Sequence, residues 1–231
     1  MNAAQAREEI CRVGQSLFER GYVHAAAGNI SVRLDDDAGY LITPTDACLG
    51  RLDPARLAHV DAQGRQHSGD PASKTLALHR RVYQAAVAFD ANTRCVIHTH
   101  STHCVALSLQ AEPEVPTASS GPREWLPALT PYFVMKVGHV PLIGYRHPGA
   151  AETADLVSQA IAQYGARGTP IRAVMLERLG PQVWHDSPAS AMAVLEELEE
   201  TAKLMRLLTP TPAPLTVSQI DELRLKFNAR W

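Results

Sequence analysis

Residues 94–100, Arg-Cys-Val-Ile-His-Thr-His, constrain the fold most, because they predict a strand that runs out of the core. Successive side chains of a strand point to opposite faces, so His98 and His100 share a face, with the bases of their rings ~6.5 Å apart. Neutral imidazoles at this spacing can converge on one divalent metal. The alternative is that one histidine is a hydrogen-bonded core residue and the other is incidental. A bare His-x-His pattern by itself favours that alternative.

Predicted helices and hairpins alternate along the rest of the chain. Apolar residues recur at helical spacing in residues 3–20, 73–88 and 151–164, and Ser187 caps a long fourth helix. Strands are predicted at 29–34 and 40–43, which form a hairpin, and at 171–176 and 182–184, which Gly180-Pro181 joins. This order predicts a mixed, largely antiparallel sheet with helices on its faces.

The remaining segments predict a loop and a tail. Residues 111–124 are rich in proline and predict a surface loop. Residues 209–214, Thr-Pro-Thr-Pro-Ala-Pro, predict a stiff linker. A short amphipathic helix follows, with Ser218 and Asp221 as its capping pair. The predicted organisation is one domain over residues 1–208 and a tail over residues 209–231.

Charge and composition exclude several classes of function. The chain has 231 residues, 45% of them hydrophobic, and a net charge of -2, which argues against a nucleic-acid or membrane-surface partner. No window is long and apolar enough to cross a bilayer, and the N-terminus lacks the pattern of a signal peptide. The four cysteines have no Cys-x-x-Cys spacing, so we expect reduced, mostly buried thiols in a cytoplasmic protein.

Longer runs around the histidine pair carry a resemblance to a known family. The strand is followed by Ser-Thr-His-Cys-Val-Ala-Leu-Ser, and upstream stand Gly28-Asn29-Ile30-Ser31 and Leu41-Ile42-Thr43-Pro44-Thr45. These runs resemble the class II aldolase/adducin family. Its 3-oxo-tetronate 4-phosphate decarboxylase branch is similar to further runs at residues 49–57, 60–64, 68–70, 129–132 and 196–204. The likeness extends over nearly the whole chain.

The resemblance implies a fold, an assembly and a set of site residues. The fold is a three-layer α/β/α sandwich around a mostly antiparallel sheet, and the assembly is a homotetramer with active sites at subunit contacts. The family's divalent metal, here expected to be zinc, is held by two histidines that match His98 and His100 and by a third in a later Asn-His-Gly turn. The family's phosphate-binding residues match Asn29, Thr45, Ser73 and Lys74, and a tyrosine near its site matches Tyr132.

Each of these matches has a simpler alternative. Ser73 can be a helix cap as well as a phosphate ligand, and Lys74 can be a solvated surface lysine. Asn29 can merely stabilise a turn, and Tyr132 can be a packed core aromatic. A helix start and a lysine are nonetheless physically sensible partners for a dianion.

Three departures from the family pattern fall on the chemistry itself. Thr75 stands where the family has its acid/base glutamate, four residues before His79, so Thr75 and Tyr132 are the remaining catalytic candidates. A threonine hydroxyl cannot act as a carboxylate base near neutral pH. Leu179 stands at the third ligand position. Asp46 replaces a glycine of the phosphate loop, where a carboxylate would repel a phosphate unless it is paired or turned away.

Other groups are candidates to replace what is lost. Asp46 and Arg178 could form a new charge pair. His103 would face away on a continuing strand, but it could turn back if a helix begins there. The candidate third ligands are Glu177, His103, His139, His147 and His185, each of which alone is more typical of a surface or core residue.

These observations support three hypotheses. The first is a metal-dependent lyase, a decarboxylase or aldolase, whose small-molecule substrate is a phosphorylated sugar acid or ketose. The second is an enzyme with a rebuilt site, because the departures cluster at the site while the scaffold motifs remain. The third is a non-catalytic binding or assembly protein. Two imidazoles bind a metal more weakly than three, so we expect weak or partial metal occupancy.

Overall fold

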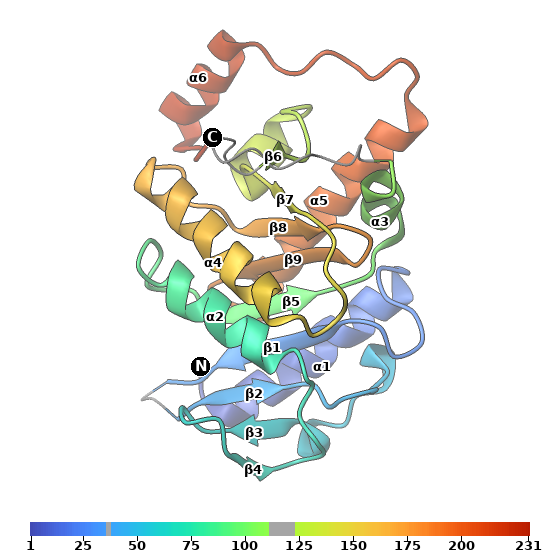
Figure 1. Ribbon diagram of the computed structural model, residues 1–231, viewed down its shortest axis with the longest axis vertical. Helices are drawn as coiled ribbons and strands as arrows, with labels where there is room; N and C mark the ends of the chain where they lie inside the picture. Colours follow the sequence, from blue (N-terminus) through green and yellow to red (C-terminus); the bar gives the residue numbers. More distant parts are fainter. Residues whose placement is uncertain (36–37, 111–122) are drawn as a thin grey trace.

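One mixed sheet runs through the whole molecule (Figure 1). The computed structural model describes residues 1–35, 38–110 and 123–231. Within these ranges the strand order is β4-β3-β2-β1-β5-β9-β8-β7-β6. The strands are β1 (Asn29–Arg33), β2 (Tyr40–Ile42), β3 (Ala58–Val60), β4 (Gln66–Ser68), β5 (Cys95–His98), β6 (Arg123–Glu124), β7 (Pro141–Ile143), β8 (Ala173–Leu176) and β9 (Gly180–His185). Neighbouring strands pair antiparallel except β7 and β8, which are parallel, so the predicted, mostly antiparallel sheet is confirmed.

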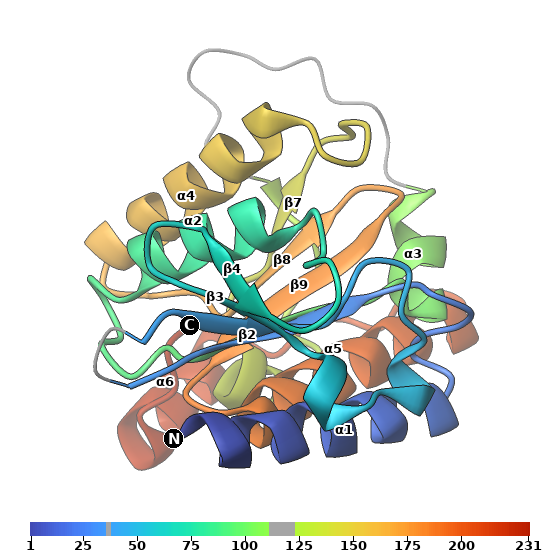
Figure 2. The ribbon, with the colours of Figure 1, turned by 90° about the horizontal axis from the view of Figure 1, so that it is seen from below.

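Helices cover both faces of this sheet. Helices α1 (Ala3–Glu19) and α5 (Pro188–Leu207) lie on one face, and α2 (Leu76–Ala86) and α4 (Ala151–Ala166) lie side by side on the other (Figure 2). This arrangement confirms the three-layer α/β/α sandwich. The shorter helical elements are η1 (Leu49–Arg51), η2 (Pro54–Arg56), α3 (Thr102–Ser108), η3 (Phe133–Val137) and α6 (Val217–Phe227).

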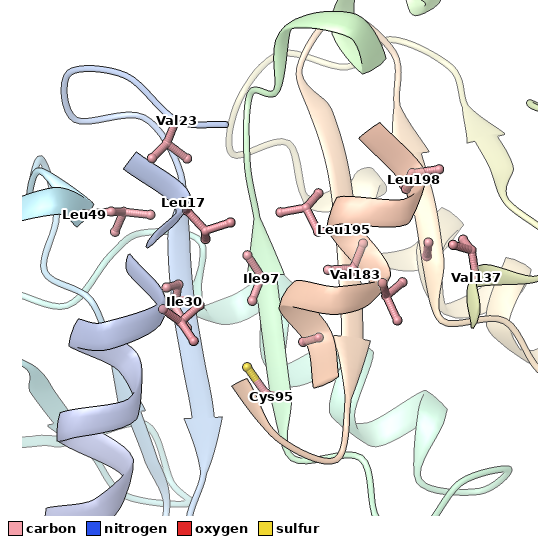
Figure 3. Packing of buried hydrophobic residues seen from close by; sticks show 14 of the residues in the cluster. Leu17, Val23, Ile30, Leu49, Cys95, Ile97, Val137, Val183, Leu195 and Leu198 are labelled. Carbon is pink, nitrogen blue, oxygen red and sulfur yellow. The ribbon is translucent and has the colours of Figure 1, made fainter. Parts of the chain in front are cut away.

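The alternating side chains of β5 divide the interior into two cores. Cys95 and Ile97 are fully buried on the α1 and α5 side, in a cluster that includes Ile30, Val183 and Leu195 (Figure 3). Val96 is fully buried on the other side, in the cluster beneath α2 and α4. Burying such an aliphatic side chain contributes ~1.5–3 kcal/mol, so the apolar residues decide which face each side chain takes. His98 follows Val96 by two residues and therefore faces α2 and α4.

The predicted connection between β8 and β9 is wrong by three residues. Gly180 and Pro181 belong to β9, and residues 177–179 form the connection. Arg178 takes the left-handed conformation there, with φ of 65°. Gly180 is required inside the strand because a Cβ atom at this position would collide with the carbonyl group of Thr99. The glycine marks a close approach of two strands instead of a turn.

The predicted cap of the last helix is also wrong. Thr216 is the N-cap of α6, and its side chain accepts from the backbone N–H of Gln219. The Gln219 side chain accepts in turn from the backbone N–H of Thr216. Ser218 and Asp221 lie inside the helix. The cap prediction for α5 is confirmed, because the Ser187 side chain accepts from the backbone N–H of Ser190 over 3.2 Å.

Two other predicted boundaries shift. Helix α2 begins at Leu76, later than the predicted residue 73, because residues 73–75 form the turn before it. Of the predicted loop at 111–124, residues 111–122 lie outside the described residues, and residues 123–124 form β6, which pairs with β7.

Helix α6 of the tail packs against the region of η3. Its residues Ile220 and Leu223 contact Ala128 and, within η3, Val134. The boundary at residue 208 stays a prediction. All four cysteines are free; Cys95 and Cys104 are buried, and Cys11 and Cys48 are half-buried.

Among the helices of the described ranges, none has the length and apolar character needed to cross a bilayer.

Candidate active site

A cavity of about 410 Å³ lies between the sheet and the first turns of α2 and α4. It brings together segments that are far apart in the sequence. Tyr132 does not line it: this residue precedes η3, and its side chain is 61% exposed. The other predicted site residues all line the cavity: Asn29, Thr45, Ser73, Lys74, Thr75, His98 and His100.

The two imidazoles of the His-x-His pair face each other at the end of β5. Their ring centroids are 5.1 Å apart and their planes are inclined by 66°. Nδ1 of His98 donates to the carbonyl oxygen of Pro181 over 3.0 Å, which leaves Nε2 unprotonated. Burial, together with the nearby His100, lowers the pKa of His98 to about 4. Burial and then the charge of His24 lower the pKa of His100. Both rings are therefore neutral near neutral pH, in the form that binds metals.

A third histidine, His79 of α2, lines the same cavity. Its Nδ1 lies 2.8 Å from Oγ of Ser31, and the Tyr83 hydroxyl donates to the Ser31 carbonyl oxygen over 2.9 Å. Oγ of Ser31 lies 2.8 Å from the Tyr83 oxygen, so the serine donates there and accepts from Nδ1–H of His79. Burial, and then the nearby His98, lower the pKa of His79 to about 3. The ring is thus neutral, with Nε2 as an acceptor.

Backbone hydrogen bonds hold two loops together at one side of the cavity. The N–H of Thr45 donates to the Pro71 carbonyl over 2.9 Å, and the N–H of Ser73 donates to the Thr43 carbonyl over 3.2 Å. The hydroxyl oxygens of Ser73 and Thr75 are 2.9 Å apart. Two hydroxyl-bearing residues, Ser73 and Thr75, therefore stand directly before α2, and the loop of Thr45 is held next to them.

The starts of two helices face this side of the cavity. Residues of the first turns of α2 and α4 line it, and the N-cap residues Thr75 and Ala150 make no side-chain cap bond. Free N–H groups and the helix dipole make such ends favourable for an anion. Lys74 is exposed beside them, and no acidic residue of the described ranges pairs with it. This side of the cavity is suited to a phosphate group.

The three departures from the family pattern all line this cavity. Asp46 is the only acidic residue in the described lining, so no second carboxylate stands there to replace the glutamate lost at Thr75. Asp46 is exposed and has φ of 56°, a conformation that favours glycine. Arg178 pairs with Glu177 at 3.5 Å, so the suggested Asp46–Arg178 pair is not formed in the part of the chain described. Leu179 is half-buried against the core beneath α2 and α4.

Most of the candidate third ligands are engaged elsewhere. His103 begins α3 instead of continuing the strand, and it turns to a carboxylate of α5. Of the five candidates, His147 alone lines the cavity. The contacts of the others are His103 Nδ1 with Glu199 at 2.8 Å, His139 Nδ1 with Glu124 at 2.8 Å, His185 Nδ1 with Asp186 at 2.9 Å, and Glu177 with the N–H of Tyr145 at 2.8 Å.

The side chains that could bind a metal do not complete the three-ligand site that the family pattern implies. A catalytic zinc takes three protein ligands and keeps one open position. Across residues 1–35, 38–110 and 123–231, no three His, Cys, Asp or Glu side chains gather in a metal-binding arrangement. His98 and His100 supply two ligands, and Leu179 stands at the third position.

Gln182 is a polar residue of the cavity that was not predicted. Gln182 lies directly opposite His98 in the β5–β9 pair, is fully buried, and lines the cavity. Its signal in the sequence is a glutamine in the otherwise apolar strand Gly-Pro-Gln-Val-Trp. The pattern could not show which face Gln182 takes, because that depends on the pairing register.

Comparison with known proteins agrees with this geometry. Residues 8–206 match the model of the class II aldolase and adducin N-terminal domain. The chain belongs to this family. A 3-oxo-tetronate 4-phosphate decarboxylase of Cupriavidus necator is 50% identical over 233 residues, which cover 99% of this chain and 98% of that protein. An L-fuculose phosphate aldolase of Methanococcus maripaludis is 31% identical over 196 residues, covering 85% of this chain and 92% of that protein.

Solved structures of family members show the same fold. YgbL of Klebsiella pneumoniae superposes with a TM-score of 0.79 at 38% identity, over 97% of this chain and 100% of that one. The L-fuculose-1-phosphate aldolase of Thermus thermophilus superposes with a TM-score of 0.70 at 26% identity, over 92% of this chain and 100% of that one. The predicted family and fold are confirmed.

Proposed function

We propose that this protein is a carbon–carbon lyase that removes carbon dioxide from a small phosphorylated 3-oxo sugar acid. The observation that carries this proposal is the shared cavity, which places the His98/His100 pair beside two helix starts suited to a phosphate. The names of the relatives support the same substrate class, since those at 35–50% identity are 3-oxo-tetronate 4-phosphate decarboxylases.

The phosphate end of the substrate is assigned to the side of the cavity next to α2. Asn29, Thr45 and Ser73 offer neutral hydrogen-bonding groups there, and Lys74 offers a positive charge without a competing ion pair in the described chain. Charge-assisted hydrogen bonds to phosphate are roughly twice as strong as neutral ones. Asp46 opposes the anion, so its carboxylate must turn towards solvent for the phosphate to bind.

Decarboxylation suits this site better than aldol cleavage does. When a 3-oxo acid loses carbon dioxide, the C1–C2 bond breaks and its electron pair moves into an enolate at C2, C3 and the 3-oxo oxygen. A proton then adds to C2, and a 3-oxo-tetronate 4-phosphate becomes dihydroxyacetone phosphate. No base is needed to start this reaction. An aldol cleavage must first remove a hydroxyl proton, for which the family pattern has a glutamate and this chain has Thr75.

A divalent metal such as zinc would bind weakly or partially through His98 and His100. When bound, it would supply a Lewis acid for the substrate oxygens. Because Leu179 stands at the third ligand position, the proposed reaction has no step that depends on this metal. The residues of the chain itself hold the phosphate, enclose the oxo acid and present neutral imidazoles to the reacting carbons.

The second candidate is a non-catalytic sugar-phosphate binding protein of the same family. It is favoured by one observation: the acid/base position and the third ligand position are both lost, while the phosphate side of the cavity is kept. Such a protein would bind the phosphorylated ligand without converting it.

Turnover measurements separate the two candidates. Dihydroxyacetone phosphate formed from a 3-oxo-tetronate 4-phosphate should be detected, with little product from the unphosphorylated acid.

Lys74→Ala should raise KM by about 10-fold or more, because a hydrogen bond to a charged group contributes ~1.5–3 kcal/mol. Asp46→Gly should lower KM by removing the opposing charge. Lys203→Ala, at an exposed lysine paired with Glu200, is the matched control and should change nothing. Binding without turnover would reject the lyase in favour of the binding protein.

A further inference from the structure

A row of polar side chains crosses three neighbouring strands beneath the cavity. Asn29 of β1 and Gln182 of β9 each lie directly opposite His98 of β5, one on either side of it. Opposed residues of antiparallel strands point to the same face of the sheet. All three side chains therefore face α2 and α4, and all three line the cavity.

Gln182 is the member of this row with the most unmet hydrogen bonding. Its side chain is 0% exposed, and neither Oε1 nor Nε2 has a partner among the described residues. Buried polar side chains are nearly always hydrogen-bonded, and an unpaired carboxamide opposes folding. A leucine or methionine of similar volume would pack here without that cost. The unmet groups of Gln182 therefore point to a ligand in the cavity.

The unpaired atoms around the cavity define what that ligand must offer. Oδ1 of Asn29 and Nε2 of His79 are also buried without a partner in the described chain. Together with Oε1 of Gln182, they are three acceptors that call for hydroxyl donors. The Gln182 amide N–H group is a donor that calls for an oxo oxygen. A carboxylate or a phosphate placed at these atoms would meet mainly acceptors, so they suit the oxo and hydroxyl groups of a ligand and not its carboxylate or phosphate.

We propose that Gln182 binds the oxo and hydroxyl groups of the substrate. Its Nε2–H donates to the 3-oxo oxygen, and its Oε1 accepts from the neighbouring hydroxyl group. This assignment rests on the proposed function, in which the phosphate lies at Ser73 and Lys74. As the C1–C2 bond breaks, the oxo oxygen gains negative charge and the hydrogen bond from Gln182 strengthens. Gln182 then favours the chemical step as well as binding.

Calorimetric titration of the full-length protein with two stable ligands tests this proposal. Dihydroxyacetone phosphate carries the oxo and hydroxyl groups, whereas ethyl phosphate carries the phosphate alone. Gln182→Leu should weaken binding of dihydroxyacetone phosphate about 10-fold and change the affinity for ethyl phosphate by less than about twofold. Its melting temperature should be equal to or above that of the parent, because an unpaired buried amide is removed. Gln182→Met gives the same test if the leucine variant does not fold.

A matched control isolates the effect of position. Thr201 of α5 is also fully buried with an unpartnered hydroxyl in the described chain, but it does not line the cavity. Thr201→Val should leave both affinities unchanged. Equal binding of dihydroxyacetone phosphate by the parent and Gln182→Leu would overturn the assignment, as would an equal loss of both ligands or no binding of dihydroxyacetone phosphate by the parent.

The outcome for Gln182 can be told apart from that of the lyase itself. If the parent binds dihydroxyacetone phosphate through Gln182 but releases no carbon dioxide from the 3-oxo acid, the assignment stands and the lyase fails. If the parent turns over the acid and Gln182→Leu binds and reacts equally well, the lyase stands and the assignment fails.

Discussion

Leu179 lines the cavity that also contains His98 and His100, at the position where the family resemblance places a third imidazole. The N–H of Leu179 donates to the Leu176 carbonyl oxygen over 3.1 Å, and Arg178 between them has φ of 65°, so a hydrogen-bonded turn carries residue 179. A side chain introduced at residue 179 would project from an ordered turn towards the cavity. The site therefore lacks a third metal ligand, whereas the turn that would carry this ligand is in place.

At the scale of single residues, we predict the zinc affinity of a double variant. Leu179→His combined with Thr75→Glu should raise the zinc affinity by at least about 10-fold, because three ligands replace two. Any lyase activity should rise with it. Titration of the metal-free protein with zinc, read by calorimetry, measures the change. His98→Ala in the same background should remove the gain. If affinity does not rise, the pocket has diverged beyond these two positions.

How far the site could be predicted depends on the residue. Asn29, Ser73, His98 and His100 stand in recognisable runs, so their convergence followed from the family pattern. Gln182 could not be placed in the same way, because a one-residue shift of register would have turned its side chain to the opposite face. Whether its amide is unpaired depends on the contacts of every neighbouring side chain. These are properties of packing and not of spacing.

At the scale of elements, helix α3 is tied to α5 by a single buried carboxylate. Oε1 of Glu199 accepts from the N–H of His103 over 2.9 Å, and Oε2 accepts from the N–H of Cys104 over 3.1 Å. Glu199 is 3% exposed. It therefore caps the start of α3, which follows β5 and the histidine pair, and holds this segment against α5. The position of His100 depends on this contact between elements.

This carboxylate predicts a loss of stability in acid. Burial by itself would raise the pKa of Glu199, but the hydrogen bonds at the start of α3 outweigh burial and lower it below 4.5. A carboxyl group with a lowered pKa stabilises the fold fully above its unfolded pKa. The contribution is lost as pH falls through the folded pKa.

Urea unfolding between about pH 5 and pH 3 measures this contribution. Glu199→Gln should show a smaller fall in the free energy of unfolding over that window than the parent does. At neutral pH, Glu199→Ala should cost about 3 kcal/mol, because it leaves buried N–H groups without an acceptor. Glu200→Gln, at an exposed neighbour, is the control. An equal acid dependence in the parent and Glu199→Gln would contradict the role of Glu199.

Elements were predictable where local signals were strong. The long helices follow from hydrophobic periodicity, and the Ser187 cap of α5 follows from capping chemistry. Both signals act within a few residues. The connection between β8 and β9 was misplaced because Gly180-Pro181 is a typical turn dipeptide. Its glycine is instead required by the close approach of Thr99, a contact between strands that are distant in the sequence.

At the scale of the whole molecule, Tyr132 stands apart from the cavity of its own chain and is 61% exposed. The resemblance places a tyrosine near the site and the sites at subunit contacts. These two statements are compatible with the structure if Tyr132 reaches the cavity of a neighbouring subunit. The homotetramer and the role of Tyr132 both stay predictions.

Native mass spectrometry should find a species of four times the 25.1 kDa chain mass. Tyr132→Phe should lower kcat by about 10- to 100-fold, the range of a modest acid/base contribution. Mixing refolded Tyr132→Phe and Lys74→Ala chains should restore part of the activity, because some sites would then combine two intact halves. A monomer, or no restoration above the sum of the two variants, would contradict a shared site.

The sequence alone determined the family, the order of the sheet-forming and helical segments, and most of the polar residues around the cavity. These follow from short-range patterns and from runs of residues that resemble the family. Tertiary structure decided which face Gln182 takes and how Ser31 and Tyr83 hold His79. It also decided that His103 turns to Glu199 instead of to His98 and His100. Each of these depends on strand register or on contacts between distant segments, and hydrogen-bonding partners exist only once the chain has packed.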